Sequence, residues 1–387
     1  MTKPRTILLL GTSQTLAWAG SYYLPAVLAA PMARDLGVST ATIFVAFSGA
    51  LLLTAFLGPR VGRAIDARGG RAILVASNLV FVAGLLLLAF AQGPVLLFLA
   101  WGVLGFGMAM GLYDPAFATL ARLYGTDARS AITGITLIAG FASTIGWPLS
   151  AAMEAAWGWR GACLGWVAIN LLVALPMNAM LPGASVRAPA AAKTAPPATP
   201  DAARETRRAA ILMAFIFTSG GFSAAALAAH LPALLVGVGA TPAAAIAAAA
   251  LMGPAQVGAR VLEFTFLRRA HPLLSAKIAN VTHPVGAALL LALGAPAAAA
   301  FVVLHGAGNG IQTIVRGTLP LAVFGAAGYG ARQGMIVAPA RVLGALAPAL
   351  FGFVVEGYGA HALWLTAGLS LAAFVALFFL RTPPRPA

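Results

Sequence analysis

The sequence predicts an all-α polytopic membrane protein with twelve transmembrane helices in two pseudo-symmetric six-helix bundles. Two observations predict this fold class. Hydrophobic residues make up 61% of the 387-residue chain and charged residues only 9%, whereas soluble domains carry about a quarter charged residues. Short patterns in the first half of the chain also recur, in the same order, in the second half, which is typical of a protein built from two related halves.

Twelve apolar segments make up most of the chain, and each is close to the roughly 20 residues that a helix needs to cross a bilayer. Lys3 and Arg5, followed by an apolar run and Ala17-Trp18-Ala19, imitate a secretory signal. We expect a retained helix instead, because Leu24-Pro25-Ala26 recurs as Leu231-Pro232-Ala233 at the end of the seventh segment. The segments are expected at approximately 6–30, 38–58, 72–91, 95–120, 130–153, 161–181, 209–235, 242–259, 278–294, 297–320, 332–355 and 360–380.

The basic residues are divided unevenly between the two sides of the membrane. If both termini are cytoplasmic, only Arg34 and Arg160 of the 24 Lys and Arg residues lie outside, and Arg341 lies within a segment. This bias follows the positive-inside rule, so the net charge of +15 requires no nucleic acid partner. The chain is rich in Ala, Gly and Arg, a composition typical of GC-rich bacteria. We therefore expect a multi-pass protein of the bacterial inner membrane with both termini cytoplasmic.

Residues 182–208 separate the two halves. They contain five prolines, many alanines and a charged end, and this composition predicts a flexible cytoplasmic linker. The N-terminal six-helix bundle then spans 1–181 and the C-terminal bundle 209–387. The patterns shared by the halves are Gly105-Phe106-Gly107 with Gly306-Ala307-Gly308, and Trp157-Gly158 with Tyr358-Gly359.

The segment 58–71 joins the second and third apolar segments and reads GPRVGRAIDARGGR. It combines four arginines and four glycines with Asp66, and a reduced copy follows at 253–263 with Glu263. A carboxylate in such a place can accept hydrogen bonds from the free N–H groups at the start of a helix and can pair with Arg. The pattern therefore favours a joint between helix ends that Asp66 holds together. The alternative is a topology signal with no part in gating.

These residues resemble the signature loop of the major facilitator superfamily (MFS) of transporters, and the resemblance covers nearly the whole chain. Gly62, Asp66, Gly69 and Arg71 match the family pattern, while Ala67 stands where the family has Arg and Arg68 comes one place late. Arg34-Asp35-Leu36-Gly37 and Gly158-Trp159-Arg160 are also similar to MFS sequences. The resemblance implies that 58–71 forms a latch, a contact that closes the cytoplasmic ends of helices in the outward-open state. Its implied members are Gly62, Asp66, Arg68, Gly69 and Arg71.

The tenth segment carries a polar stripe. His305, Asn309, Gln312 and Arg316 follow the spacing i, i+4, i+7 and i+11 and so share one helix face. Polar groups facing hydrocarbon are costly, and they mark a transport pathway by default. The alternative is a set of hydrogen bonds between helices. In MFS proteins, segments one, four, seven and ten surround the central cavity, which agrees with the pathway interpretation.

Other candidate pathway residues lie on the first and seventh segments. Gln14, Trp18 and Tyr22 share a face of the first, and Ser219 and Ser223 lie on the seventh. Trp18 and Tyr22 could stack on an organic solute. The alternative for Tyr22 is a place at the membrane interface, where aromatic residues are common.

Asp114 and Arg341 are expected within the membrane, and Arg316 at the cytoplasmic end of the tenth segment. Asp114 lies late in the fourth segment before Pro115, which should bend the helix. We expect Asp114 to pair with Arg316 at the cytoplasmic gate, unless each residue only caps its own helix. Arg341 lies nine residues after Arg332 and therefore about 14 Å deeper along a helix. It is either a counter-ion for a buried acid or a binding group for an anionic solute, and we favour the latter.

Several classes of function are disfavoured. The five histidines and the single Cys163 lack metal-ligand spacing, so no metal and no other cofactor is expected. No phosphate-binding glycine loop and no catalytic cluster is evident, so we expect neither an ATP-driven pump nor an enzyme. Trp101 replaces the Arg of the drug-antiporter motif, which disfavours drug/proton antiport without excluding efflux.

These observations predict a secondary active transporter that works by alternating access, which its two halves would perform around a central site. The expected partners are a small-molecule solute, protons and the lipid bilayer, and a monomer is expected. Arg316 and Arg341 outnumber Asp114, which favours an anionic organic solute. Asp114 or His305 could couple transport to protons. The alternatives are an uncoupled facilitator, and a transporter-like receptor or assembly protein without transport.

Overall fold

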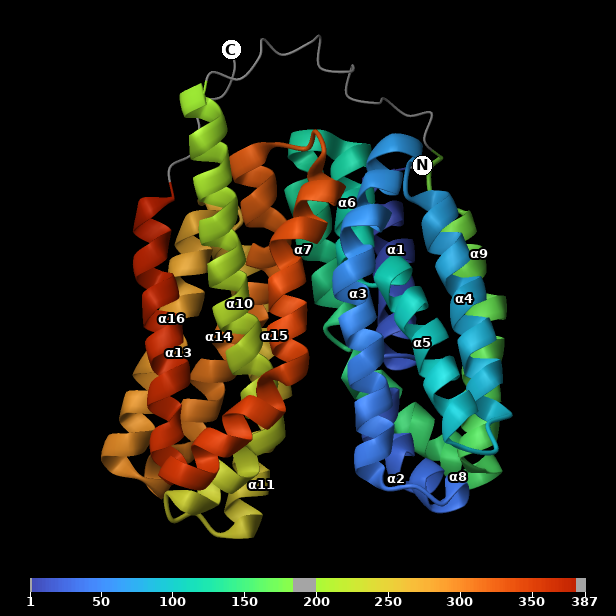
Figure 1. Cartoon of the computed structure of the whole chain (residues 1–387). Coiled ribbons are helices and arrows are strands. Elements are labelled where there is room, and N and C mark those ends of the chain that lie inside the picture. The colour runs from blue at the N-terminus through green and yellow to red at the C-terminus, as the bar shows by residue number, and fades with distance from the viewer. Residues whose placement is uncertain (1, 184–199, 381–387) are drawn as a thin grey trace. The chain divides into compact units, whose positions relative to one another are not determined.

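The computed structural model describes residues 2–183 and 200–380, and within them every regular element is a helix (Figure 1). The chain divides into two compact units. Unit 1 comprises Met1–Lys193 and Ala326–Ala338, and unit 2 comprises Thr194–Gly325 and Pro339–Ala387. Residues 184–199, most of the linker predicted at 182–208, lie outside the described residues, as do 381–387.

Unit 1 begins with a helix that is interrupted at Gly20–Tyr23 and resumes in the same predicted segment. Each unit has an apolar core of its own, and that of unit 1 includes Phe81, Trp101 and Trp166. The helices of unit 1 are α1 (Lys3–Ala19), α2 (Leu24–Leu36), α3 (Thr40–Arg68), α4 (Arg71–Ala89), α5 (Pro94–Gly111), α6 (Tyr113–Tyr124), η1 (Gly125–Asp127), α7 (Ala128–Ala139), α8 (Ala142–Ile169), η2 (Asn170–Ala174) and α9 (Leu175–Ala179).

Unit 2 contains the remaining helices and most of the long helix α15. Its apolar core includes Leu290, Phe301 and Phe351. The helices are α10 (Pro200–Gly237), α11 (Pro242–Ala250), α12 (Met252–Leu262), η3 (Glu263–Leu267), α13 (Pro272–Leu293), η4 (Ala295–Ala297), α14 (Ala298–Phe324), α15 (Tyr329–Tyr358), η5 (Gly359–Ala362), α16 (Leu363–Ala376) and η6 (Leu377–Phe379). Helix α15 begins in unit 1 and continues in unit 2 from Pro339.

Nine helical stretches among the described residues are long and apolar enough to cross a membrane. Two of them, Ala128–Ala179 and Tyr329–Phe379, have 52 and 51 residues, which is room for two crossings of about 20 residues each. The shorter α1 and α2, with 17 and 13 residues, follow one another and supply a further crossing. The all-α, twelve-helix membrane fold predicted from the sequence is therefore confirmed.

The repeated Gly-x-Gly pattern lies where helices pack most closely in unit 1. A Cβ atom on Gly105 of α5 would lie 2.7 Å from the Ala50 carbonyl oxygen of α3. A Cβ on Gly107 would lie 2.8 Å from the Phe81 ring of α4. Only glycine permits both approaches, so the pair fixes α5 against α3 on one side and α4 on the other.

The second copy of the pattern has the same role in unit 2. A Cβ on Gly306 of α14 would lie 3.0 Å from the Met252 carbonyl oxygen at the start of α12. A Cβ on Gly308 would lie 2.8 Å from the Ala279 carbonyl oxygen of α13. In each unit the first glycine therefore meets the second membrane segment of that half, and the second glycine meets the third. The sequence repeat thus corresponds to a repeat of helix packing.

Parts of two segments that the sequence predicts as connections are helical. Helix α3 continues through the segment 58–71 as far as Arg68, and the turn consists of Gly69 and Gly70 alone. Gly69 ends the helix with a positive φ of 87°, a conformation that favours glycine. Residues 200–208, which we assigned to the linker, form the first turns of α10. Pro200 and Asp201 suit the start of a helix, and the Ala, Glu and Arg residues that follow are good helix formers.

Candidate functional site

Asp66 binds the start of α15 within unit 1. Its Oδ1 accepts a hydrogen bond from the Gly330 N–H at 2.9 Å, and its Oδ2 accepts one from the Ala331 N–H, also at 2.9 Å. The first N–H groups of a helix have no partner inside the helix, and the helix dipole favours a negative charge there. The Asp66 carboxylate therefore caps α15 with both of its oxygens.

Glycines allow the two backbones to come this close. A Cβ on Gly62 of α3 would collide with the backbone of Gly330 and Ala331. A Cβ on Gly334 of α15 would lie 2.6 Å from the Pro59 nitrogen. Gly62, which matches the MFS pattern, is thus required by a direct backbone approach rather than by a turn. Gly334 was not predicted, although glycines surround the start of α15 in the sequence.

The arginines of the segment 58–71 have other surroundings. Arg68 and Arg71 are exposed, and among the described residues neither bonds to Asp66. Arg122, from the end of α6, instead donates to the carbonyl oxygens of Asp66 and Ala67 at the end of α3. A cation at a helix C-terminus is favourable, so Arg122 stabilises the end of the helix that carries Asp66. In the sequence, Arg122 lies two residues beyond the predicted end of the fourth segment at 120.

A second carboxylate lies near the same stretch of α15. Helix α5 ends at Gly111, Leu112 is extended, and α6 starts at Tyr113 with Asp114 in its first turn. The segment is therefore broken one residue before Tyr113 rather than bent at Pro115. Asp114 is 8% exposed, and its Oδ1 lies 3.4 Å from the Nε2 of the buried Gln333. Arg316 belongs to unit 2 and Asp114 to unit 1, so their pairing stays a prediction.

The other two MFS-like sequences meet at one place in unit 1. Arg160 forms a salt bridge with Asp35 at the end of α2, and the Trp159 Nε1–H donates to the same carboxylate at 3.1 Å. Arg160 also donates to the Ala91 carbonyl oxygen at 2.6 Å, beyond the end of α4. The Arg160 guanidinium, and secondly the Trp159 indole, lower the pKa of Asp35 below its usual value of 3.8. Gly158, with a φ of 69°, breaks α8 just before this pair.

The predicted pathway residues of α1 lie beside the breaks in the helices of unit 1. The Gln14 Nε2 donates to the Gly111 carbonyl oxygen at 2.7 Å, where α5 ends. The ring of Trp18 lies 4.9 Å from that of Tyr113, the first residue of α6. The structure thus joins Gln14 and Trp18 to the interrupted fourth segment.

Trp18 belongs to a larger aromatic cluster. Tyr22 lies 5.0 Å from Trp18 and 5.5 Å from Phe47 between ring centroids, and it is 36% exposed. Two buried polar atoms, the Gln14 Oε1 and the Trp18 Nε1, have no hydrogen-bond partner within the described residues. Such atoms are uncommon in native structures and are candidates for contact with a ligand or water. The aromatic cluster consists of Trp18, Tyr22, Tyr23, Phe47, Trp101, Tyr113, Phe117 and Trp147.

Unit 2 brings predicted pathway residues of α10 and α14 close together. Ser219 and Ser223 are each 3% exposed on α10. The Nε2 of Gln312 on α14 lies 3.1 Å from where a Cβ would stand on Gly220, so the amide reaches α10. Within the described residues the Ser223 Oγ and both amide atoms of Gln312 have no hydrogen-bond partner. Asn309 lies one turn before Gln312 and is partly buried.

His305 has a different environment from the rest of the polar stripe. It is 4% exposed, and its Nδ1 lies 3.1 Å from the Nδ1 of His283 on α13. This is a contact between helices, the alternative considered for the stripe. Arg316 and Arg341 are partly buried on α14 and α15.

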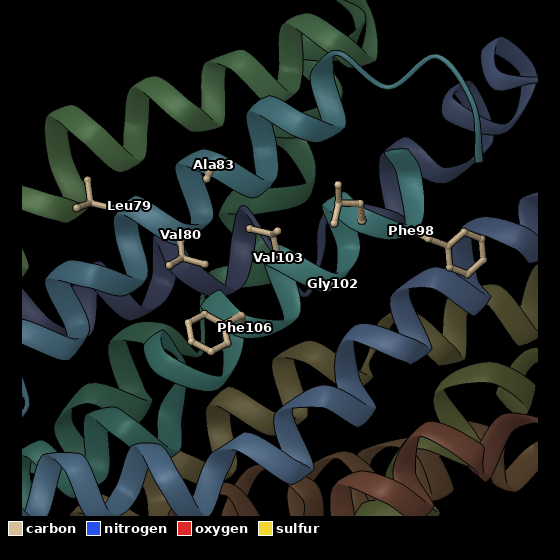
Figure 2. Close-up of a pocket in the computed structure, with 8 residues that line it drawn as sticks. Leu79, Val80, Ala83, Phe98, Gly102, Val103 and Phe106 are labelled. Atoms are coloured by element: carbon tan, nitrogen blue, oxygen red, sulfur yellow. The ribbon is translucent and has the colours of Figure 1, made fainter. Parts of the chain in front are cut away.

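A pocket on the surface of unit 1 contains none of the predicted pathway residues. It is an open groove of about 560 Å³ on unit 1, between α4 and α5 (Figure 2). The residues that line it are all apolar, so the groove offers no group to orient a polar solute. They are Leu79, Val80, Ala83, Phe98, Leu99, Gly102, Val103 and Phe106. In the part of the chain that the structure describes, no group of three His, Cys, Asp or Glu side chains could hold a metal ion.

Comparisons with known proteins agree with this architecture. The family model of the Major Facilitator Superfamily matches residues 10–298. An uncharacterized 38 kDa protein in the 23S RNA operon of Thermoproteus tenax is 29% identical over 368 residues, which are 90% of this chain and 88% of that protein. A multidrug resistance protein B homolog of Mycobacterium tuberculosis is 32% identical over 145 residues, which are 37% of this chain and 25% of that protein.

Solved structures show the same fold at low sequence identity. The E. coli fucose:proton symporter FucP superimposes with a TM-score of 0.75 at 16% identity, covering 98% of this chain and 100% of FucP. The human organic anion transporter TETRAN superimposes with a TM-score of 0.70 at 16% identity, covering 97% of this chain and 100% of TETRAN. With the family model matching most of its length, the chain is a multi-pass membrane transporter that belongs to the Major Facilitator Superfamily.

Proposed function

We propose that the chain is a secondary active transporter that moves a small organic solute by alternating access and couples this movement to protons. The observation that carries the proposal is the Asp66 cap on α15. The capped stretch belongs to unit 1, whereas the rest of the same helix belongs to unit 2. Releasing these two hydrogen bonds would remove the polar contact that holds the start of α15 to the end of α3.

Helix α15 has a suitable place to bend. Pro339 is the first residue of α15 in unit 2. Proline lacks the N–H that would bond one turn back, and it weakens a helix at that point. A bend at Pro339 would let the stretch 329–338 separate from α3 while the remainder of the helix keeps its packing. We infer that Gly62, Asp66 and Gly69 act in the latch through this contact, with Arg122 as a further member and with Arg68 and Arg71 outside it.

The surfaces proposed for the solute are the aromatic cluster in unit 1 and the Ser223 and Gln312 side chains in unit 2. The cluster combines flat rings with the Trp18 Nε1 and the Gln14 Oε1, which have no hydrogen-bond partner in the part of the chain that the structure describes. Rings stack on the faces of sugars or aromatic molecules, while the polar atoms can orient them. Arg316 and Arg341 support an anionic solute. FucP carries fucose with protons and TETRAN carries organic anions by their names, so fucose and an aromatic carboxylate are suitable first probes.

The proposal is tested on the purified full chain in liposomes. Thermal shift is first measured with fucose, benzoate and a metabolite panel, because a bound solute stabilises the native state. Uptake of each hit is then compared with and without an imposed pH gradient. We expect the rate of uptake to rise several-fold when a pH gradient is imposed. A protonophore should return it to the rate measured without a gradient. Equal uptake in both conditions would indicate an uncoupled facilitator, and binding of a protein partner with no solute movement would indicate a receptor.

We propose that the chain is a monomer of the bacterial inner membrane, with halves 1–181 and 209–387 joined by the linker 182–208. In the proposed orientation the Asp66 contact lies on the cytoplasmic side of the membrane and Arg160 lies outside. This can be checked with single cysteines at the exposed residues Arg34 and Arg268 in a Cys163→Ala background. A membrane-impermeant maleimide added to whole cells should label the cysteine at 34 and not the one at 268. The reverse pattern would invert the proposed topology. The relationship to a multidrug resistance homolog makes efflux the direction to assay first.

A further inference from the structure

Two histidines form a buried pair in unit 2, where α13, α14 and α16 meet. His283 and His305 are each 4% exposed. Their Nδ1 atoms lie 3.1 Å apart and their ring centroids 4.8 Å apart. The ring of Phe301 lies 5.8 Å from that of His283 and 6.1 Å from that of His305, so one aromatic side chain contacts both imidazoles. The pair is thus enclosed by apolar groups and connected to the protein through polar atoms.

The hydrogen bonds around the pair define which nitrogen carries each proton. The Thr366 hydroxyl donates its only hydrogen to the Leu363 carbonyl oxygen at 3.0 Å. It must therefore accept at its oxygen from the His283 Nε2, which lies 2.9 Å away. A neutral imidazole has one N–H, so the His283 Nδ1 is an acceptor. The Nδ1 of His305 must then be the donor across the 3.1 Å contact.

This assignment leaves one basic atom in the network. A neutral His305 that carries its proton on Nδ1 has a lone pair on Nε2. A proton bound there forms one N–H bond, breaks none, and adds one positive charge that the imidazolium shares between its two nitrogens. His305 keeps donating to His283 in this form. A second proton on the His283 Nδ1 would point at the His305 Nδ1–H over 3.1 Å, so the pair accepts one proton and not two.

Charged groups on the packed helices are distant from the pair or already engaged. On α13, Lys277 lies six residues from His283, about 9 Å along the helix, with its Nζ over the Phe378 ring. On α14, Arg316 lies eleven residues from His305, about 16 Å along the helix. Arg260 of α12 donates to the Gly310 carbonyl oxygen and to Thr313. Glu263 of η3 accepts from Ser275, two turns before His283.

The other helices around the pair add no nearer charge. Within Leu363–Ala376 of α16 and within α11 and η4 the sequence has no ionisable side chain. On α10 the titratable residue within the membrane stretch is His230, whose Nε2 lies 2.8 Å from the Pro348 carbonyl oxygen. The two histidines are therefore the groups that can take up a proton at this place in unit 2.

We propose that His283 and His305 form a one-proton binding site inside unit 2, with the His305 Nε2 as the atom that takes the proton. The inference rests on the proton-coupled transport proposed above and supplies its proton site. His305 shares a face of α14 with Asn309 and Gln312, so a charge on His305 acts on the helix face that carries the proposed solute contacts. Under this proposal His305, and not Asp114, is the residue that couples transport to protons.

The test is nitrogen-15 NMR of the histidine side chains in the full chain, reconstituted in lipid nanodiscs. The five histidines are assigned with single His→Gln variants. At neutral pH we expect the Nδ1–H tautomer for His305 and the Nε2–H tautomer for His283. On lowering the pH from about 8 to about 4, both rings should change in one common step that binds one proton. The opposite tautomers, two independent steps, or a pair that stays neutral throughout would each overturn the site.

Variants separate the pair from general effects on the fold. His305→Gln should abolish the common step and leave the spectrum of His230 unchanged, whereas the exposed His361→Gln should leave the common step intact. Persistence of the step in His305→Gln would overturn the proposal. The measurement uses no solute. If the pair binds a proton but uptake does not depend on the gradient, the proposed coupling is contradicted and the site is not. If uptake depends on the gradient but the pair binds no proton, only the site is contradicted.

Discussion

The Asp66 carboxylate binds two successive backbone N–H groups of Gly330 and Ala331, each at 2.9 Å. These residues are 264 and 265 positions away in the sequence. The two hydrogen bonds use only backbone atoms of α15, so they depend on how closely the backbones approach and on the negative charge of Asp66, which Arg332 of the same helix also attracts. Such a contact closes without steric interlocking and opens when the backbones separate. This combination suits a helix end that must be held in one transport state and released in another.

Gly62→Ala should disfavour this contact without unfolding unit 1. The added methyl group collides with the backbone of Gly330, and overpacking of this kind costs about 1–3 kcal/mol. A cysteine replacing Ile336, which is 3% exposed, reports opening of α15 through its rate of maleimide labelling in a Cys163→Ala background. We expect about tenfold faster labelling, the change that 1.4 kcal/mol produces. Gly49→Ala on the same helix α3, where a Cβ meets nothing within 4 Å, is the matched control.

Trp18→Phe should weaken solute binding and leave stability unchanged. The Trp18 Nε1 has no partner within the described residues, whereas the ring contacts of Trp18 survive in Phe. Loss of one hydrogen bond to the solute costs about 1 kcal/mol, close to fivefold in Kd. Trp166→Phe should lower stability and leave solute binding unchanged, because the Trp166 Nε1 donates to the buried Ser150 Oγ at 3.0 Å. Calorimetry of binding and of unfolding on both variants distinguishes the two roles, and a lowered Tm in Trp18→Phe would contradict ours.

The Asp35–Arg160 salt bridge should stabilise the protein in a pH-dependent way. The pKa of Asp35 is lower in the folded protein than its usual value of 3.8, so the stabilisation is present above that value and is lost as the pH falls through the folded pKa. The Tm difference between wild type and Arg160→Gln should therefore be largest at neutral pH and shrink in acid. Arg34→Gln removes an exposed arginine beside Asp35 and serves as the control. A difference that grows as the pH falls would show that another group is responsible.

The predicted pairing of Asp114 with Arg316 has its own genetic test. Asp114→Arg and Arg316→Asp should each lose transport, because each leaves two like charges at the proposed gate. The double variant should recover activity to within about tenfold of wild type if the pair is direct. Uptake of the thermal-shift hit in liposomes measures this. Failure of the double variant to exceed either single variant would contradict a direct pair and would leave Gln333 of α15, whose amide lies 3.4 Å away, as a described contact of Asp114.

Much of the fold was predictable because the bilayer constrains the sequence so strongly. Apolar length located the crossings, and the Gly105-x-Gly107 and Gly306-x-Gly308 patterns marked equivalent close contacts in the two halves. The ends of helices were less predictable. Helix α3 continues through Arg60, Arg63 and Asp66, because the Arg and Ala residues of this stretch are good helix formers, and it ends before Gly69.

The sequence predicts some residues of the proposed site and not others. Asp66 and Gly62 stood out through charge and spacing, but their partners Gly330 and Ala331 contribute only backbone atoms and therefore leave no side-chain pattern. The spacing of the polar stripe of α14 indicates one surface, yet His305 turns to His283 on α13. Periodicity gives the face of a helix and not the helix that the face meets.

The most direct test of the account follows the distance between α3 and the start of α15. Spin labels on cysteines replacing the exposed Arg63 and Ala327, in a Cys163→Ala background, report it by pulsed electron paramagnetic resonance in nanodiscs. We predict a short and a long population in the otherwise wild-type protein. Asp66→Asn should shift most of the short population to the long one, whereas Asp127→Asn, another carboxylate of unit 1, should not. A single short distance that is the same in both variants would contradict a releasable Asp66 contact.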